Sequence, residues 1–297
     1  MSYKVMVPLD GSRLAENSLV YLDALKSLGE SEVLLVSVVD ESEEFRGIAD
    51  ADSQAREANL LATYLREVHA DIEKHLGVSV ETKVLTGSPA AALIEEAARY
   101  APDLIVISTG GRSGVSRWRV GSVADKVIRA ASGNMLVVGP KAAERSSWID
   151  ARIIEPFRTL LVPLDGSELA ERALPVATAF ADAYGSVLHL VRVVPIPTVT
   201  GGMGGEASYV PDLLETLIDS AKAYLSDTAA KLNRPVTTEA VVGSAVVRLE
   251  DYVNEHAIDL VVMTTHGRSG FVRTALGSVT DRLLGGAAPV LVVRARE

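Results

Sequence analysis

The chain contains no cysteine, which excludes disulfide bonds, thiolate metal ligands and a cysteine nucleophile. A chain without cysteine fits a reducing compartment, and we expect a cytoplasmic protein. The first residues lead directly to Asp10 and leave no room for the apolar stretch of a signal peptide. No uncharged run approaches the length of a membrane span, so we expect no membrane partner.

Positive charge is in the minority. The 29 Lys and Arg residues face 39 Asp and Glu residues, which gives a formal net charge of -10. This excess repels phosphate backbones at long range, so nucleic acid is not expected as a partner. Hydrophobic residues make up 48% of the chain and charged residues 23%, which is typical of a globular protein. A length of 297 residues favours two domains.

Several catalytic signatures are missing from the sequence. No Gly-x-x-x-x-Gly-Lys-[Ser/Thr] occurs, and no Gly-x-Gly-x-x-Gly follows the first apolar run, which disfavours Walker ATPases and dinucleotide dehydrogenases. A Gly-x-Ser-x-Gly nucleophile elbow is absent as well. His266 lies in a glycine-rich segment, but Gly110 stands at the matching place in the first half. We therefore expect no catalytic residue shared by both halves and no metal site.

What the sequence does contain is a duplication. Val5–Ser12 returns as Leu160–Ser167, and Asp103–Val106 returns as Asp259–Val262, in the same order. The repeated unit is as long as a domain, which indicates two tandem domains and not a solenoid. We expect domains at residues 1–140 and 157–297, joined by a linker at 141–156. Because the linker is short, the domains are expected to pack side by side as a pseudo-twofold pair.

Within each copy, short apolar runs alternate with helical periods, which predicts an α/β fold with a parallel sheet. Residues 33–39 are almost continuously apolar and predict a central strand, whereas 78–84 alternate and predict an edge strand. A helix is expected where five apolar residues recur at spacings of three and four before Gly77. These residues are Leu61, Leu65, Val68, Ile72 and Leu76. The other expected strands are 104–107, 135–138, 187–194, 236–242, 260–263 and 290–293.

The first candidate site is the turn that follows the first strand of each copy. In α/β sheets, ligands lie beyond the carboxyl ends of the strands, where the strand order reverses. Asp10-Gly11-Ser12 occupies this place in copy one. Gly11 allows a sharp turn, Ser12 can cap the next helix, and Asp10 either binds a ribose or adenine edge or only stabilises the turn. The second copy has Asp165 and Gly166 at the matching positions.

The second candidate site follows the fourth strand. Copy one carries Gly111 and Gly114, and then Gly121-Ser122-Val123. The corresponding residues of copy two are Gly267, Gly270, Gly277, Ser278 and Val279.

Both glycine-rich segments lead into a predicted helix. We expect Ser122 and Ser278 to be the N-caps, with Asp125 and Asp281 as their capping-box partners. The free N–H groups of such a first turn, next to glycines that let a ligand approach closely, bind anions well. Phosphate is therefore the expected guest of this segment.

Taken together, these motifs resemble those of the universal stress protein family. They are the Pro-Leu-Asp-Gly-Ser that ends the first strand and the glycine-rich segment beginning at Gly267, with Gly277-Ser278 ten residues later. The resemblance covers both copies, so the chain looks like a tandem member. It implies two Rossmann-like domains of the adenine nucleotide alpha hydrolase type. Each would have a five-stranded parallel sheet of order 3-2-1-4-5, with helices on both faces.

The resemblance also implies ATP, alone or with Mg²⁺, as the ligand. Its phosphates would lie on the glycine segment, Asp10 and Asp165 would face the adenosine, and Val38 and Val193 would meet the adenine. The family motif is Gly-x2-Gly-x9-Gly-[Ser/Thr], and this chain departs from it at the first glycine. Ser108 stands there in copy one and Thr264 in copy two.

From this we expect an ATP-binding stress-response regulator that acts through changes in conformation or assembly, and that forms a homodimer. Two alternatives remain open. One is slow ATP hydrolysis, for which neither copy offers a clear general base. The other is an interaction module without ligand, in which the last strands, 135–138 and 290–293, pair domains or protomers.

Overall fold

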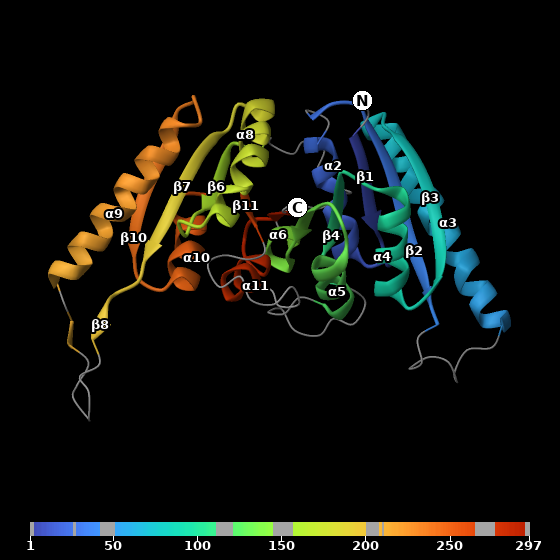
Figure 1. Ribbon diagram of the computed structural model, residues 1–297. Coiled ribbons are helices and arrows are strands. Elements are labelled where there is room, and N and C mark those ends of the chain that lie inside the picture. Colours follow the sequence, from blue (N-terminus) through green and yellow to red (C-terminus); the bar gives the residue numbers. More distant parts are fainter. Residues whose placement is uncertain are drawn as a thin grey trace. The chain divides into compact units, whose positions relative to one another are not determined.

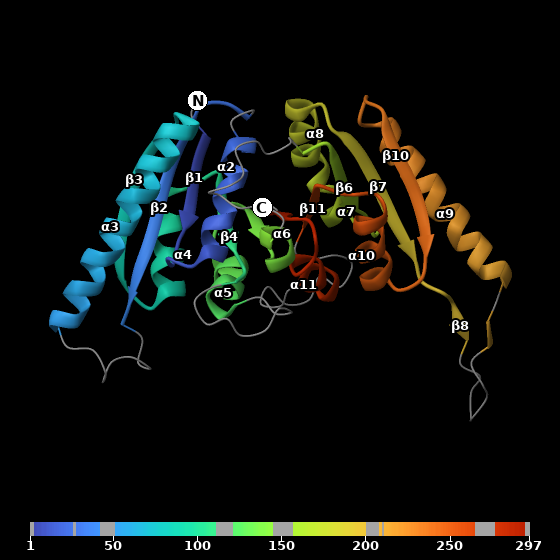
Figure 2. The same cartoon turned by 180° about the vertical axis from the view of Figure 1, so that it is seen from behind.

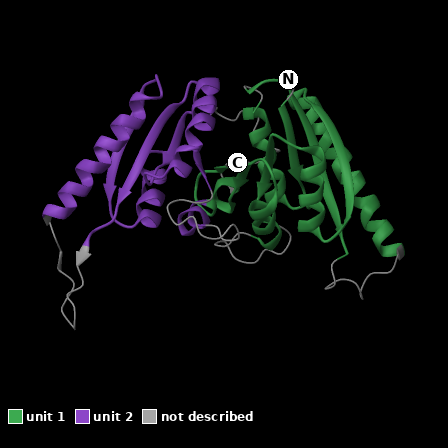
Figure 3. Cartoon of the chain, in the orientation of Figure 1, with its two compact units in different colours: residues 1–156, 273–275, 284–294 green, residues 157–272, 276–283, 295–297 purple. Residues whose placement is uncertain are grey.

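The computed structural model describes residues 3–25, 28–41, 51–110, 121–144, 157–199, 208–209, 211–264 and 277–294. The chain divides into two compact units, which are coloured separately in Figure 3. Unit 1 contains residues 1–156, 273–275 and 284–294, and unit 2 contains residues 157–272, 276–283 and 295–297.

Unit 1 is built on a parallel sheet with the strand order β3-β2-β1-β4-β5. This order is the one that the family resemblance implied, and the α/β prediction is confirmed. β2 lies between two strands and is buried along most of its length, whereas the outer strand β3 is largely part-exposed, as expected. The strands are β1 (Tyr3–Pro8), β2 (Ser31–Asp40), β3 (Ser79–Gly87), β4 (Leu104–Ser108) and β5 (Asn134–Val138).

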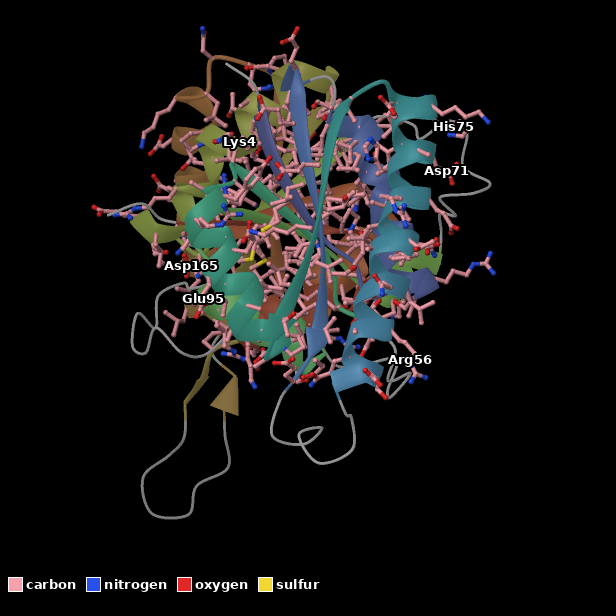
Figure 4. The ribbon with its side chains drawn as sticks, turned by 90° about the vertical axis from the view of Figure 1, so that its right-hand side faces the viewer. Lys4, Arg56, Asp71, His75, Glu95 and Asp165 are labelled. Atoms are coloured by element: carbon pink, nitrogen blue, oxygen red, sulfur yellow. The ribbon has the colours of Figure 1, made fainter. Side chains whose placement is uncertain are left out.

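Helices cover both faces of this sheet, with α3 on one face and α4 on the other (Figures 1, 2 and 4). On α3, the predicted apolar residues Leu61, Leu65, Val68 and Ile72 are buried, while Arg56, Asp71 and His75 lie on its exposed side (Figure 4). The helices are α1 (Arg13–Glu16), the 3-10 helix η1 (Asn17–Leu19), α2 (Val20–Leu25), α3 (Ala51–Leu76), α4 (Pro89–Tyr100), α5 (Ser122–Ala130) and α6 (Pro140–Glu144).

A strand from the end of the chain completes unit 1. β12 (Val290–Val293) pairs antiparallel with β5, and Val290 lies opposite Val137. The next residue extends this attachment, because the Arg294 N–H donates to Asn134 Oδ1 at 3.1 Å and its guanidinium donates to the carbonyl oxygen of Ile128. Burial lowers the pKa of Arg294. The two last strands that the sequence singled out therefore do pair with each other.

Unit 2 repeats the parallel arrangement with the strand order β10-β7-β6-β11. Its strands are β6 (Thr159–Pro163), β7 (Val187–Val194), β10 (Val236–Val242) and β11 (Leu260–Thr264), and a small antiparallel pair is formed by β8 (Thr198–Val199) and β9 (Ser208–Tyr209). The helices of the second copy are α7 (Glu168–Glu171), α8 (Ala173–Tyr184), α9 (Pro211–Ala230), α10 (Ala245–Glu255) and α11 (Ser278–Leu284).

A buried carboxylate ties α4 to β3 in unit 1. Glu96 on α4 is only 4% exposed, and it accepts hydrogen bonds from Lys83 Nζ at 2.8 Å and from Arg99. Burial by itself raises the pKa of Glu96, but the hydrogen bonds and charges of Arg99 and Lys83 outweigh it, so the pKa is lowered. Glu96 therefore stays ionised and paired inside the unit.

Unit 2 has an aromatic and histidine cluster between β7 and α10. His189 on β7 is buried, and its Nδ1 lies 2.9 Å from the Tyr252 hydroxyl. Tyr252 in turn stacks on His256, with ring centroids 3.9 Å apart. Burial, followed by the nearby Glu239, raises the pKa of Tyr252, so its hydroxyl stays protonated. Burial, followed by the nearby His256, lowers the pKa of His189, against an opposing effect of Glu239.

The lowered pKa of His189 predicts acid sensitivity. In the unfolded chain His189 takes up a proton near the ordinary histidine pKa of about 6.5, whereas in the folded protein it is protonated only at a lower pH. The stabilisation is therefore complete above the pKa of the unfolded state and is lost as the pH falls below that pKa. We expect His189→Leu, which installs the Leu34 of the first copy, to weaken the fall in unfolding free energy between pH 7.5 and pH 5, measured by urea unfolding. His75→Leu, at an exposed position, serves as the control. An unchanged pH dependence in His189→Leu would contradict the prediction.

Candidate functional site

The turns after β1 and β6 have the same backbone conformation. Gly11 has a φ of 77° and Gly166 a φ of 86°, values that glycine adopts without the steric cost of a side chain. Just before each glycine, the chain is tied to the neighbouring strand. The Leu9 N–H donates to the Val36 carbonyl, and in copy two the Leu164 N–H donates to the Val191 carbonyl, both at 2.8 Å. Both turns thus begin at a fixed point at the carboxyl edge of the sheet.

The aspartates of these turns hold the backbone in place. Asp10 Oδ1 accepts the Ser12 N–H at 2.9 Å. Asp165, which is labelled in Figure 4, accepts both the N–H of Ser167 at 2.9 Å and its hydroxyl at 2.6 Å. The turn-stabilising role that the sequence suggested is confirmed, and contact of either aspartate with adenosine stays a prediction.

The serine of each turn caps the helix that follows, as predicted for Ser12. Ser12 Oγ accepts the Ala15 N–H at 3.2 Å, and Ser167 Oγ accepts the Ala170 N–H at 3.1 Å. The two turns are therefore rigid elements whose conformation is fixed by their own side chains.

Two valines predicted to meet adenine lie near the ends of the second strands. Val38 in β2 and Val193 in β7 are both part-exposed, whereas the next residues, Val39 and Val194, are buried. Their place at the carboxyl edge fits the expectation, and contact with adenine stays a prediction.

The residues at the first glycine position of the family motif are buried. Ser108 is 8% exposed, and its hydroxyl bonds to the backbone of Gly110, with 3.2 Å to the carbonyl oxygen and 3.3 Å to the N–H. Thr264, at the end of β11, is 6% exposed. Ser108 therefore braces the start of the segment that follows β4.

Gly121 brings the chain back to the end of β4. Its N–H donates to the Thr109 carbonyl at 2.9 Å, and the Thr109 N–H donates to the Val138 carbonyl at 3.0 Å. A β-carbon on Gly121 would lie 3.1 Å from the Thr109 oxygen, which is tight against rigid backbone. Glycine at this position lets α5 begin directly against the strand end.

The predicted N-cap of α5 is wrong by one residue. The helix already includes Ser122, because the Asp125 N–H donates to the Gly121 carbonyl at 2.9 Å, and Gly121 is the N-cap. Asp125 is not a capping-box partner and pairs with Arg129, with 2.7 Å between their closest atoms. In the second copy the Asp281 N–H donates to the Gly277 carbonyl in the same way, and Ser278 is likewise the first residue of its helix rather than its cap.

This correction changes what the first turn of α5 offers. The N-cap residue, Gly121, has no side chain to cap the helix. The N–H groups of Ser122 and Val123 therefore have no intrahelical acceptor, and no side chain among the described residues caps them. Such donors, at the positive end of a helix dipole, suit an anion. In copy two, Gly277 and Ser278 are exposed and Val279 is part-exposed. Gly111, Gly114, Gly267 and Gly270 lie outside the described residues.

Sequence reasoning missed one residue at the second turn. The Arg192 guanidinium, from β7, packs against Gly166, where a β-carbon would lie 3.1 to 3.2 Å from its atoms. Its Cζ lies 4.8 Å from the ring centroid of Tyr224 on α9. The available signal was an arginine within an apolar strand, at the position where the first copy has Ser37.

Neither a metal site nor a membrane span is found in the described part of the chain. No cluster of three or more histidine and acidic side chains there could hold a metal ion. Among the helices described, none combines the length and apolar character needed to cross a bilayer.

The serine positions make a matched stability test. Ser12→Ala should lower the free energy of unfolding by about 1 kcal/mol, because it removes a helix cap. Ser122→Ala should change it by less than about 0.5 kcal/mol, because Ser122 caps nothing. Urea unfolding of both variants measures the difference. An equal loss of unfolding free energy in both variants would indicate that Ser122 caps α5 after all.

Both halves of the chain match known proteins. The family model of the universal stress protein family matches residues 1–139 and 156–294. A universal stress protein of Methanocaldococcus jannaschii is 33% identical over 138 residues, which cover 46% of this chain and 81% of that protein. A universal stress protein of Mycobacterium tuberculosis is 26% identical over 219 residues, covering 73% of this chain and 70% of that protein.

A solved structure extends the likeness to the fold of the whole chain. The crystal structure of a universal stress protein from Archaeoglobus fulgidus matches with a TM-score of 0.72 and 18% identity, covering 98% of this chain and 96% of that one. This likeness shows a shared fold. With the family pattern present in both halves, the chain belongs to the universal stress protein family as a tandem member.

Proposed function

We propose that each half binds an adenine nucleotide, ATP, at the carboxyl edge of its sheet. The observation that carries this proposal is the first turn of α5, whose N-cap Gly121 has no side chain and holds the turn against the end of β4. β4 pairs directly with β1, so this turn and the Asp10 turn follow adjacent strands, where the strand order reverses. A ligand with a polar head and an anionic tail fits the two features.

On this proposal, different residues contact the adenosine and the phosphates of the ligand. In the first half, Asp10 and Gly11 would face the ribose, Val38 the adenine, and the N–H groups of Ser122 and Val123 the phosphates. In the second half the corresponding residues are Asp165, Gly166, Val193, Ser278 and Val279. Mg²⁺, when present, would accompany the phosphates as a counter-ion.

Binding and regulation fit this site better than catalysis does. Asp125, the carboxylate in the first turn of α5, is engaged by Arg129, which leaves it poorly suited as a general base. We propose that the nucleotide stabilises the conformation that binds it, and so adjusts assembly or partner binding in a cytoplasmic stress response.

A ligand-independent interaction module is the second candidate. It is supported by the antiparallel pairing of β5 with β12, the last strands of the two copies. On this proposal the tandem domains form a pseudo-twofold pair, and chains associate further as homodimers.

A charge placed at α5 tests nucleotide binding. Ser122→Glu adds a carboxylate in the first helical turn, where negative charge stabilises the helix, but it would repel a bound phosphate. We expect Mg-ATP affinity in the first half to fall by about tenfold or more, with the second half unchanged, as measured by isothermal titration calorimetry. Ser122→Gln, which has the same shape without the charge, should bind like the wild type.

The two outcomes separate the candidate functions. If Ser122→Glu and Ser122→Gln bind ATP equally, the phosphates do not lie at α5. If neither variant nor the wild type binds any adenine nucleotide, the interaction module remains. Sedimentation of the wild type with and without Mg-ATP tests the regulatory part, since a regulator should change its assembly or its shape with the nucleotide.

A further inference from the structure

The two halves differ by a positive charge beside the aspartate turn. The matching hydrogen bonds from Leu9 to Val36 and from Leu164 to Val191 align the second strands, and they place Arg192 where the first copy has Ser37. Ser37 is buried, and its hydroxyl donates to the Leu9 carbonyl at 2.8 Å. The first half therefore has a small, internally bonded side chain at this position, and the second half has a guanidinium.

Neighbouring side chains hold Arg192 in one place. Two guanidinium nitrogens and Cζ all lie 3.1 to 3.2 Å from the β-carbon position of Gly166, so the flat group lies face-on against the turn. Tyr224 contacts it through its ring, and the Tyr224 hydroxyl donates to Glu171 Oε1 at 2.9 Å. Burial, together with this bond, raises the pKa of Tyr224 to about 12, so the hydroxyl remains a donor.

The hydrogen-bonding edge of Arg192 has no acceptor among the residues that the structure describes. Its side chain is part-exposed at the carboxyl edge of the sheet. A guanidinium carries five N–H donors in a planar fork, which matches the oxygens of a phosphate or carboxylate. The face of the group is therefore engaged by the protein, and its edge is presented outward.

The strand order says which part of a ligand this edge meets. β6 lies between β7 and β11, and Arg192 reaches from β7 over the turn that follows β6. The phosphate chain of the proposed nucleotide would lie on the other side, at the end of β11. An anion at Arg192 must therefore belong to the ribose end of the ligand.

We propose that Arg192 recognises a phosphate on the ribose, so that the second half prefers adenine nucleotides phosphorylated at the 2′ or 3′ hydroxyl. This inference rests on the proposed nucleotide site and adds a specificity-determining residue to it. The first half, with Ser37 buried and already bonded, has no such preference. The tandem chain thus carries two sites of different selectivity.

Ligand isomers test the proposal without changing the number of phosphate groups. ADP is compared with adenosine 2′,5′-bisphosphate and adenosine 3′,5′-bisphosphate by isothermal titration calorimetry of the full chain. At one of the two sites we expect at least one bisphosphate to bind about tenfold more tightly than ADP. Arg192→Gln should abolish this preference, because it weakens the bisphosphates more than ADP.

Two further variants serve as a control and as an independent test. Lys222→Gln, at an exposed position on α9, removes one positive charge elsewhere and should keep the preference. Tyr224→Phe retains the ring but loses the bond to Glu171, and it should weaken the preference severalfold while leaving ADP affinity unchanged. If far-UV circular dichroism shows that Arg192→Gln does not fold, the Tyr224→Phe variant tests the role of Arg192 in its place.

The failures can be told apart. ADP binding without preference for either bisphosphate overturns the role of Arg192 and leaves the proposed function standing. Equal loss of ADP and bisphosphate binding in Arg192→Gln also overturns it, because the residue would then support the turn in general. If no adenine nucleotide binds the wild type, both proposals fall.

Discussion

The parallel pairing of β1 with β4, and of β6 with β11, is the constraint on which both candidate sites depend. Parallel neighbours end at the same edge of a sheet, so the turn after one strand and the segment after the other are brought together by the backbone alone. The side chains then refine this arrangement. Asp10 and Ser12 fix the turn through hydrogen bonds to its own backbone, and Gly121 lets α5 start against Thr109.

Much of this architecture could be predicted from the sequence, because apolar periodicity reports burial directly. The run at 187–194 coincides with β7, and the buried face of α3 was found from the spacing of Leu61 and Leu65. The cap of α5 was missed because a serine beside a glycine looks like a cap, whereas the backbone bond from Asp125 to Gly121 decides the start. Arg192 was missed because its contacts with Gly166 and Tyr224 are long-range.

The two copies keep a common backbone and fill it with different chemistry. Where α4 meets β3, the first copy buries Glu96 in a pair with Lys83. In the second copy the counterpart of α4, α10, instead joins Tyr252 to His189 on β7. The helix thus buries an ion pair in the first copy and a nearly neutral pair in the second, and the two pairs respond to pH through different groups. Duplication has preserved the strand order and the aspartate turns while the buried polar groups changed independently.

The position of β12 in unit 1 has a consequence for synthesis. β5 belongs to the first copy, yet the strand that covers its edge, β12, follows all the other strands of the second copy. Until β12 leaves the ribosome, the first sheet carries an open edge of unpaired N–H and carbonyl groups, which is a template for pairing with other chains. The sheet of the first half is therefore completed only after the strands of the second half have been made. A chain truncated before β12 would keep an exposed strand edge that favours aggregation.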